Sequence, residues 1–246
     1  MQVSIVIAVL NSHKIVVRQL RHFKMMQLPE DVEFILVDDG SNPPLAYETC
    51  GLRNLHIYYT NDKRPWTQGL ARNLGASKAT GEYLFFTDID HIISREAIDA
   101  VLNFNGDRMT FPRYFGIFDR KGNLHTDKNS VLVFGLDPGY YKRHKLNAGV
   151  HGNTQAIRRT LFNDLGGYDP KYCQSLFHVG GRFMSEERNF NNKWSRYVKR
   201  TKGVKEGVGP KIYHYPVSKF HVDKNNNPHG MFHSLSLEQK PQPIKS

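Results

Sequence analysis

The sequence predicts an α/β fold in which helices flank a mainly parallel central sheet. Near-continuous apolar runs at Val3–Val9, Glu33–Val37 and Tyr83–Phe86 are typical of strands that are covered on both faces. Segments with the apolar spacing of helices, 14–26 and 66–79, alternate with these runs. The 246 residues, 39% of them hydrophobic, are enough for one to two domains. Because no repeat or clear linker interrupts the chain, we expect a single compact unit.

The remaining elements follow in chain order. Ser12 precedes the first helix and is of the residue type that caps helix N-termini. The second strand runs into the turn signal Asp38-Asp39-Gly40-Ser41, and His56–Tyr59 forms a short third strand. Gly81 is expected to end the second long helix. The next strand ends in Thr87-Asp88-Ile89-Asp90, which completes a pattern of alternating strands and helices.

Polar residues gather where these strands end. They follow the first, second and fourth strands and are Asn11, Asp38, Asp39, Asp88 and Asp90. Open α/β sheets bind ligands outside the carboxyl ends of their strands, so we expect these residues to line one crevice. The chain has neither a Gly-x-Gly-x-x-Gly after the first strand nor a Gly-x-x-x-x-Gly-Lys-Ser/Thr. This argues against dinucleotide-binding and P-loop sites.

Asp88 and Asp90 form an Asp-x-Asp pair whose side chains share one face of an extended backbone. Two such carboxylates can hold Mg²⁺ or Mn²⁺, which prefer oxygen ligands and commonly also bind substrate phosphates. A strand-end turn with solvated carboxylates is the alternative interpretation of this pair.

Charge is distributed unevenly along the chain. Residues 1–105 carry 10 Lys and Arg against 12 Asp and Glu, whereas residues 106–246 carry 24 against 11. The densest part, 193–224, has nine Lys and Arg against Glu206 and Asp223. This excess indicates either a solvated basic face or a surface for an anionic partner such as nucleic acid, an acidic polymer or lipid headgroups.

The cysteine and hydropathy patterns predict a cytoplasmic protein. Cys50 and Cys173 are too few for a thiolate zinc site or a disulfide framework, so a reducing setting is expected. No apolar run reaches 18 residues, the mean hydropathy is −0.54, and the N-terminus lacks the features of a signal peptide. We therefore expect no transmembrane segment.

Five segments, in this order, resemble glycosyltransferase family 2 with the GT-A fold. They are Ile35–Ser41 (ILVDDGS), Gly69–Ala76 (GLARNLGA), Gly81–Asp90 (GEYLFFTDID), Gly152–Arg159 (GNTQAIRR) and Leu165–Asp169 (LGGYD). The resemblance covers roughly residues 1–190. It implies a nucleotide-sugar-binding half at 1–105 and an acceptor-binding half at 106–246, with a polar tail from about 223.

The resemblance implies transfer of a hexose or pentose from a UDP-sugar, with inversion and with Mn²⁺ or Mg²⁺ bound. It implies that Asp39 accepts a hydrogen bond from uracil, that Arg72 lies near the base or diphosphate, and that Asp90 ligates the metal. Asp88 would face the ribose or the metal. The donor-binding candidates are Ala8, Asn11, Asp38, Asp39, Arg72, Asn73 and Asp88. An ion pair of Arg72 with a strand-end carboxylate and capping of the turn by Asp38 remain as alternatives.

In the family, the catalytic base lies in an acidic segment that opens a helix after a Gly-Gly-Tyr/Phe-Asp turn. The matching segment is Ser185–Phe190, which makes Glu187 the candidate base and Glu186 an acceptor contact. It departs from the family pattern, because Glu187 and Asn189 each replace an aspartate. Acids that stabilise a helix N-terminus are the alternative interpretation.

A histidine often completes the metal site in such folds. Among the twelve histidines His214 is the best-placed candidate and His221 the second. His91, although it lies beside the Asp-x-Asp pair, shows no spacing typical of a metal ligand.

The basic segment 193–211 is predicted to form a mobile cationic loop near the site. Its aromatic residues, Trp194 and Tyr197, suit stacking on nucleic acid or sugar. The acceptor-binding candidates are Arg182, Trp194, Arg196, Lys199 and Arg200. They indicate an anionic acceptor, namely DNA with a hydroxymethylated base, an acidic glycan, or a phosphate-linked lipid or polymer.

Two other functions agree less well with the sequence. A non-catalytic nucleic-acid-binding protein would use the basic half, but it has little use for carboxylates at strand ends. A nucleotidyltransferase is disfavoured because the Gly-rich phosphate loop is missing.

Overall fold

The computed structural model describes residues 2–46, 52–62, 64, 67–118, 124–126, 147–172, 177–179, 182–214, 217–218, 221–222, 228–229 and 233–234. Both cysteines and most of the predicted polar tail lie outside these residues. In the part of the chain described, every helix is too short or too polar to cross a lipid bilayer.

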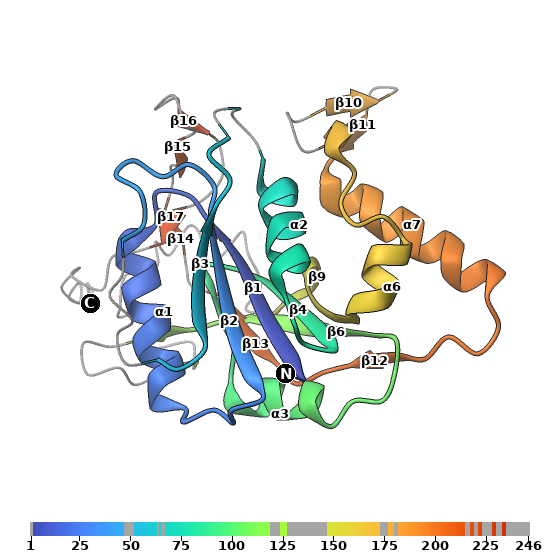
Figure 1. Cartoon of the computed structure of the whole chain (residues 1–246), viewed down its shortest axis with the longest axis horizontal. Coiled ribbons are helices and arrows are strands. Elements are labelled where there is room, and N and C mark those ends of the chain that lie inside the picture. Colours follow the sequence, from blue (N-terminus) through green and yellow to red (C-terminus); the bar gives the residue numbers. More distant parts are fainter. Residues whose placement is uncertain are drawn as a thin grey trace, which may run out of the picture.

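A nine-stranded sheet forms the centre of the fold (Figure 1). Four parallel strands make one side of it, in the order β3 (Leu55–Tyr59), β2 (Val32–Asp38), β1 (Val3–Val9) and β4 (Tyr83–Asp88). The long strand β9 (Asn147–Arg158) then runs antiparallel between β4 and β6 (Arg108–Phe115). Beyond it lie β13 (Ile212–His214) and β12 (Glu206–Val208), both parallel to β6, and β5 (His91–Ile92), antiparallel to β13. The sheet is mostly parallel, as expected, with β9 reversing the direction in its middle.

Helices cover both faces of this sheet, so β1 and β2 are buried along their whole length. On one face, Ile5 and Ile7 of β1 pack in a cluster with residues of α1 (His13–Met25) and α3 (Arg95–Leu102). On the other, Val6 and Ala8 pack in a cluster with residues of α2 (Gln68–Lys78), α6 (Arg159–Asp164) and α7 (Glu186–Arg200). The alternation of side chains along a strand thus divides the core into two layers.

Small elements complete the described residues. They are the 3-10 helix η1 (Pro170–Tyr172) and the antiparallel pairs β10 (Phe177–Val179) with β11 (Arg182–Met184), β7 (Ile117–Phe118) with β8 (Leu124–His125), β14 (Val217–Ser218) with β17 (His233–Ser234), and β15 (His221–Val222) with β16 (Pro228–His229).

Three local predictions need correction. Ser12 occupies the N-cap position of α1, but its hydroxyl donates to the Leu10 carbonyl and does not cap the helix. Gly81 does not end α2, because the helix stops at Lys78 with Ala79 following. A Cβ at Gly81 would lie 2.7 Å from the backbone nitrogen of Ser4, so glycine is needed there for close approach to β1. The segment predicted as a loop at 193–211 is instead partly helix and strand, since its first part belongs to α7 and 206–208 form β12.

A buried carboxylate, that of Glu33, links the first residues of neighbouring strands by hydrogen bonds. Oε1 of Glu33, on β2, accepts hydrogen bonds from Ser4 Oγ (2.5 Å), Thr80 N (2.7 Å), Thr80 Oγ1 (2.9 Å) and Gly81 N (3.3 Å). One side chain therefore joins β1, β2 and the turn between α2 and β4. Burial alone would raise the pKa of Glu33, but these hydrogen bonds outweigh it and lower the pKa below its ordinary value.

Replacing Glu33 with glutamine is expected to lower the free energy of unfolding by about 1–3 kcal/mol at neutral pH, because hydrogen bonds to the charged group are weakened. A lowered folded-state pKa contributes stability above the ordinary value of 4.5, and this contribution declines as the pH falls through the folded pKa. The gap between wild type and variant should therefore narrow in acid. Urea unfolding at neutral and acidic pH measures it.

The matched control is Glu30→Gln, because Glu30 is exposed and pairs with an exposed Arg53. It should change the free energy of unfolding by less than about 0.5 kcal/mol. Equal losses for the two variants, or a gap that stays constant with pH, would contradict the role of the Glu33 carboxylate.

Candidate active site

The carboxyl ends of three parallel strands meet at one edge of the sheet, which confirms the predicted convergence. In the β1–β2 register Val9 is paired with Asp38, and in the β1–β4 register Ala8 is paired with Asp88. The polar residues that follow these strands are thereby brought side by side. The N-terminus of α2 lies at the same end of the strands (Figure 1).

Asp38 and Asn11 organise the loop between β2 and β3. The two carboxylate oxygens of Asp38 accept hydrogen bonds from the backbone nitrogens of Ser41 (2.8 Å) and Leu45 (2.7 Å). Asn11 accepts from the Asn42 nitrogen (2.8 Å), and its own backbone nitrogen donates to Ser41 Oγ (2.9 Å). Asp38 is 1% exposed. These hydrogen bonds agree with the alternative prediction that Asp38 caps the turn. Asp38 and Asn11 therefore hold the loop that borders the site.

Asp39 is held by two threonines that the sequence analysis did not single out. Its Oδ1 accepts hydrogen bonds from Thr67 Oγ1 (2.6 Å) and Thr60 Oγ1 (3.1 Å). Thr67 is fully buried at the N-cap position of α2, although its hydroxyl makes no cap hydrogen bond. From sequence, a threonine directly before a helix is expected to cap that helix. Only the folded structure shows that the Thr67 hydroxyl binds Asp39 instead. The carboxylate thus has a set orientation at the end of β2.

Arg72 lies entirely inside the protein and forms an ion pair with Asp88. Burial alone would lower the pKa of Arg72, but the carboxylate of Asp88, helped by Glu186 and Glu187, outweighs it and raises the pKa. Its guanidinium also lies 5.7 Å from the centroid of the Tyr168 ring. The structure therefore contains the ion pair named as an alternative, and this pair orients Asp88 from within the fold.

Asn73, the residue after Arg72, reaches across to the Gly-Gly-Tyr turn. Its Nδ2 donates to the Tyr168 carbonyl (2.7 Å), and its Oδ1 accepts from the Tyr168 nitrogen (2.9 Å). Tyr168 is itself fully buried, and this burial raises the pKa of its phenol to about 12. Asn73 thus positions the turn, and Tyr168 stays neutral beside Arg72.

Asp88, Asp90 and His91 form a group that can hold a metal ion. Each offers one ligand atom, and these atoms lie within 4.8 Å of one another. This corrects the prediction that His91 has no place in a metal site. The chain turns sharply between β4, which ends at Asp88, and β5, which begins at His91. The turn brings His91 to the two carboxylates of the Asp-x-Asp pair.

The imidazole of His91 is buried and oriented by its neighbours. Nδ1 lies 2.7 Å from Thr154 Oγ1, while Nε2 lies 3.1 Å from Arg113 Nη1 and 4.0 Å from Asp88 Oδ2. Oxygen and imidazole donors suit Mn²⁺. Two carboxylates and an imidazole therefore suit a divalent cation, which at Nε2 would take the place of the Arg113 guanidinium.

His214 lies on β13, and its backbone is paired with that of His91 on β5. Its side chain, like that of His221, lies outside the described residues, so ligation by His214 stays a prediction.

Glu186 and Glu187 open α7, where the resemblance placed the acidic segment. Ser185 caps the helix by accepting a hydrogen bond from the Arg188 nitrogen (3.2 Å). Glu186 is 2% exposed, whereas Glu187 is only partly buried. A Cβ added at Gly152 of β9 would lie 2.5 Å from Glu187 Oε1, so the helix N-terminus packs closely on this strand. Both carboxylates act electrostatically on Arg72, which joins them to the strand-end group.

Three of the predicted acceptor residues lie further along α7 than these carboxylates. Trp194 is 3% exposed, donates from Nε1 to Glu206 Oε1 (2.7 Å) and lies under the guanidinium of Arg108. It belongs to the core because its position on α7 faces the sheet, so the stacking role expected for it is wrong. Lys199 and Arg200 are exposed but lie about 18 Å or more from Glu187 along the helix.

The two remaining acceptor candidates are Arg196 and Arg182. Arg196 is exposed on the outer face of α7, and the side chain of Arg182, on β11, lies outside the described residues.

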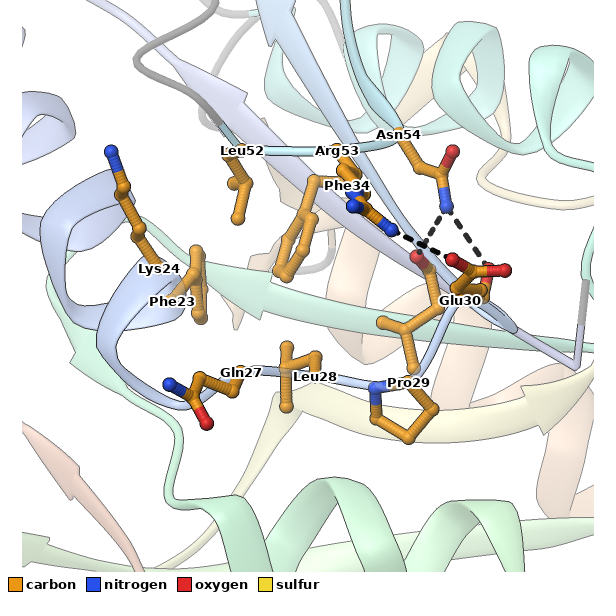
Figure 2. A pocket seen from close by; sticks show the side chains of 11 residues that line it. Phe23, Lys24, Gln27, Leu28, Pro29, Glu30, Phe34, Leu52, Arg53 and Asn54 are labelled. Carbon is orange, nitrogen blue, oxygen red and sulfur yellow. Dashed lines mark hydrogen bonds and ion pairs between the residues drawn. The ribbon is translucent and has the colours of Figure 1, made fainter.

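A separate hollow of about 340 Å³ lies at the opposite ends of the strands (Figure 2). Its walls are formed near the start of β2 and β3 and the end of α1, and include Phe23, Phe34 and Leu52. An ion pair between Arg53 and Glu30 borders it. Since the carboxylates gather where the strands end, this hollow is not part of the candidate active site.

The sequence model described as "Glycosyltransferase like family 2" matches residues 4–109, which contain β1 to β4 and the Asp-x-Asp pair. Residues 4–109 are thus similar to glycosyltransferase family 2. The glycosyltransferase GlyG of Streptococcus pneumoniae is 28% identical over 102 residues, 40% of this chain and 33% of that relative. An uncharacterized glycosyltransferase of Haemophilus influenzae is 34% identical over 83 residues, 30% of this chain and 31% of the relative. The chain therefore spans about a third of the length of these curated relatives.

Solved glycosyltransferases share the fold. S. aureus TarS 1-349 in complex with UDP superposes with a TM-score of 0.52 at 15% identity, over 88% of this chain and 61% of that one. The mannosyltransferase PcManGT from Pyrobaculum calidifontis, in complex with GDP-Man and Mn²⁺, gives 0.53 at 17% identity, over 89% and 57%. The chain thus has the GT-A fold predicted from its sequence.

Proposed function

We propose that this protein is a metal-dependent, inverting glycosyltransferase that moves a hexose or pentose from a UDP-sugar to an acceptor hydroxyl. One observation carries the proposal: the carboxylates that end β2 and β4 lie at the same edge of the sheet, and Asp88 of β4 acts on the buried Arg72 together with the two glutamates that open α7. The family match of residues 4–109 supports the same function.

The donor nucleoside is assigned to the ends of β1 and β2. Asp39, oriented by Thr60 and Thr67, offers a carboxylate acceptor, which is what the imide N–H of uracil requires. Ala8 and Asn11 lie at the end of β1 in the same region and would line the nucleoside pocket. UDP is the nucleotide bound by TarS, whereas PcManGT binds GDP-Man, so the choice of base is part of the test.

Asp88, Asp90 and His91 would hold Mn²⁺ or Mg²⁺, with His214 as a further candidate. A bound cation would neutralise negative charge on the diphosphate as it leaves. Arg72 pairs with Oδ1 of Asp88, while Oδ2 lies 4.0 Å from His91 Nε2. PcManGT, which shares the fold, is in complex with Mn²⁺.

Glu187 is the proposed general base, and Glu186 the proposed acceptor contact. The acceptor oxygen forms a bond to the anomeric carbon while the bond from that carbon to the diphosphate oxygen breaks, and UDP departs. The acceptor proton passes to the Glu187 carboxylate. Attack opposite the leaving group inverts the anomeric centre in one displacement. Glu187 suits this role better than Glu186, because it is the less buried of the two.

The excess of positive charge in residues 106–246 supports an anionic acceptor. An acidic glycan or a phosphate-linked polymer fits this charge. Modified DNA fits less well, as does the alternative of a non-catalytic nucleic-acid-binding protein, because Trp194 is buried and cannot stack on bases.

Calorimetric titration of UDP, GDP and dTDP, each with and without Mn²⁺, tests the donor assignment. We expect UDP to bind in the presence of Mn²⁺, and much more weakly without it. Tighter binding of GDP would show that the donor is a GDP-sugar and not a UDP-sugar. Failure of all three nucleotides to bind would overturn the transferase function.

A further inference from the structure

The segment from Arg188 to Lys205 is strongly basic. It contains seven Lys and Arg and no acidic residue. Six of the seven side chains are exposed, and we call them the α7 basic face: Arg188, Arg196, Lys199, Arg200, Lys202 and Lys205. The seventh, Lys193, is partly buried and donates to the Gly167 carbonyl (2.9 Å).

The helical period explains why these cations face outward. Phe190 and Trp194 are buried against the sheet. Arg188, Arg196 and Lys199 follow a spacing of eight and three residues, which places them together on the side of α7 turned away from the sheet. From Arg188 to Lys199 they extend over about 17 Å of helix. The end of α7 and the turn after it form one margin of the molecule (Figure 1).

We propose that the α7 basic face is a docking surface for anionic lipid headgroups, which would hold the protein at a membrane surface. A polybasic segment beside an anionic membrane is attracted without any specific pocket, and each Lys or Arg adds to the binding. The long aliphatic stems of lysine and arginine also suit contact with an interface. Val208, three residues after Lys205, is 74% exposed and adds an apolar side chain close by in the chain.

The same segment is poorly suited to nucleic acid. Single-stranded nucleic acid is held by exposed aromatic side chains between the cations. Here Trp194 is in the core and Tyr197 is partly buried, with the two ring centroids 5.6 Å apart. What remains exposed is charge and aliphatic stem, which is the chemistry that a headgroup layer recognises.

Docking through the part of the α7 basic face from Arg196 to Lys205 would leave the candidate active site accessible, whereas Arg188 lies next to Glu187. Lys199 lies about 18 Å along the helix from Glu187, so the lipids would contact the far end of α7. The inference does not depend on the proposed transferase activity, because it rests on charge, exposure and helix geometry alone.

Vesicle co-sedimentation tests the inference with the whole protein and no sugar donor. We expect binding to vesicles that mix phosphatidylcholine with phosphatidylglycerol, and none to phosphatidylcholine alone. The double variant Lys199→Glu/Lys202→Glu should bind the mixed vesicles more than tenfold more weakly, since each charge is worth about fivefold. Added salt should weaken wild-type binding in the same way.

The matched control is Arg21→Glu/Lys24→Glu, which makes the same change of net charge at two exposed positions of α1, on the other face of the sheet. It should bind the mixed vesicles nearly as wild type does, and thermal unfolding would verify that both variants are folded. Absence of wild-type binding, equal losses in both variants, or tighter binding to a short DNA duplex at the same salt would overturn the proposal.

Discussion

Replacing Asp90 with alanine is expected to abolish Mn²⁺-dependent binding of UDP and to lower turnover by about 1,000-fold or more. Asp90 supplies one of the three ligand atoms of the Asp88–Asp90–His91 group. Without its carboxylate, only the Asp88 carboxylate remains beside the imidazole. A bound cation contributes several kcal/mol of charge stabilisation, and each 1.4 kcal/mol corresponds to about tenfold in rate. Calorimetry with UDP and Mn²⁺, followed by rate measurements on the same variant, provides the test.

Asp90 is a better choice for this experiment than Asp88. Removing Asp88 would leave the fully buried Arg72 without its ion-pair partner, a change that costs about 3–5 kcal/mol in comparable cases. An Asp88 variant would therefore confuse loss of metal with loss of fold.

Asp164→Ala is the control for Asp90→Ala, because Asp164 is exposed at the end of α6 and distant in sequence from the candidate ligands. It should retain both binding and rate. If Asp90→Ala bound UDP with the same dependence on Mn²⁺ as wild type, the metal assignment would be wrong, even if the enzyme proved to be a transferase.

The second large effect is expected at Glu187. Glu187→Gln should lower kcat by about 100- to 10,000-fold, the usual contribution of a general base, and leave UDP binding unchanged. Glutamine keeps the size and the hydrogen-bonding capacity of the side chain but cannot accept the acceptor proton. Rate assays in parallel with nucleotide titrations separate a chemical defect from a binding defect.

Glu186→Gln is the informative companion, because the two acids are adjacent but differ in exposure. If kcat fell only in Glu186→Gln, Glu186 and not Glu187 would be the general base. If neither variant lowered kcat, the carboxylates that open α7 would be helix-stabilising acids only. The anomeric configuration of the product, read by NMR, tests the inverting stereochemistry independently of both variants.

Several features could be predicted from local sequence because they depend on local patterns. The continuous apolar runs at Val3–Val9 and Tyr83–Phe86 are strands buried on both faces, as their pattern indicates. The turn at Asp38–Ser41 and the helix that opens at Glu186 also lie where short-range signals place them. Parallel pairing then aligns the strand ends, so the cluster of carboxylates follows from the order of the elements.

Other features depend on residues that are far apart in the chain. The sequence pattern of basic and aromatic residues around Trp194 is the same for a surface loop and for an amphipathic helix, and only packing against the sheet shows that Trp194 is buried. The partners of Asn73 are at Tyr168, 95 residues away, so its structural role is invisible to any local window. Likewise, Thr67 orients Asp39 across 28 residues.

The sequence by itself determined the α/β class, the strand ends that carry the acidic residues, and the similarity of residues 4–109 to glycosyltransferase family 2. Only the tertiary structure decided which side chains meet: His91 with Asp88 and Asp90, Arg72 with Asp88, and the outward direction of the α7 basic face. The reason is physical. Strand and helix patterns repeat over a few residues and follow from local burial, whereas a site depends on how turns and distant strands bring individual atoms together.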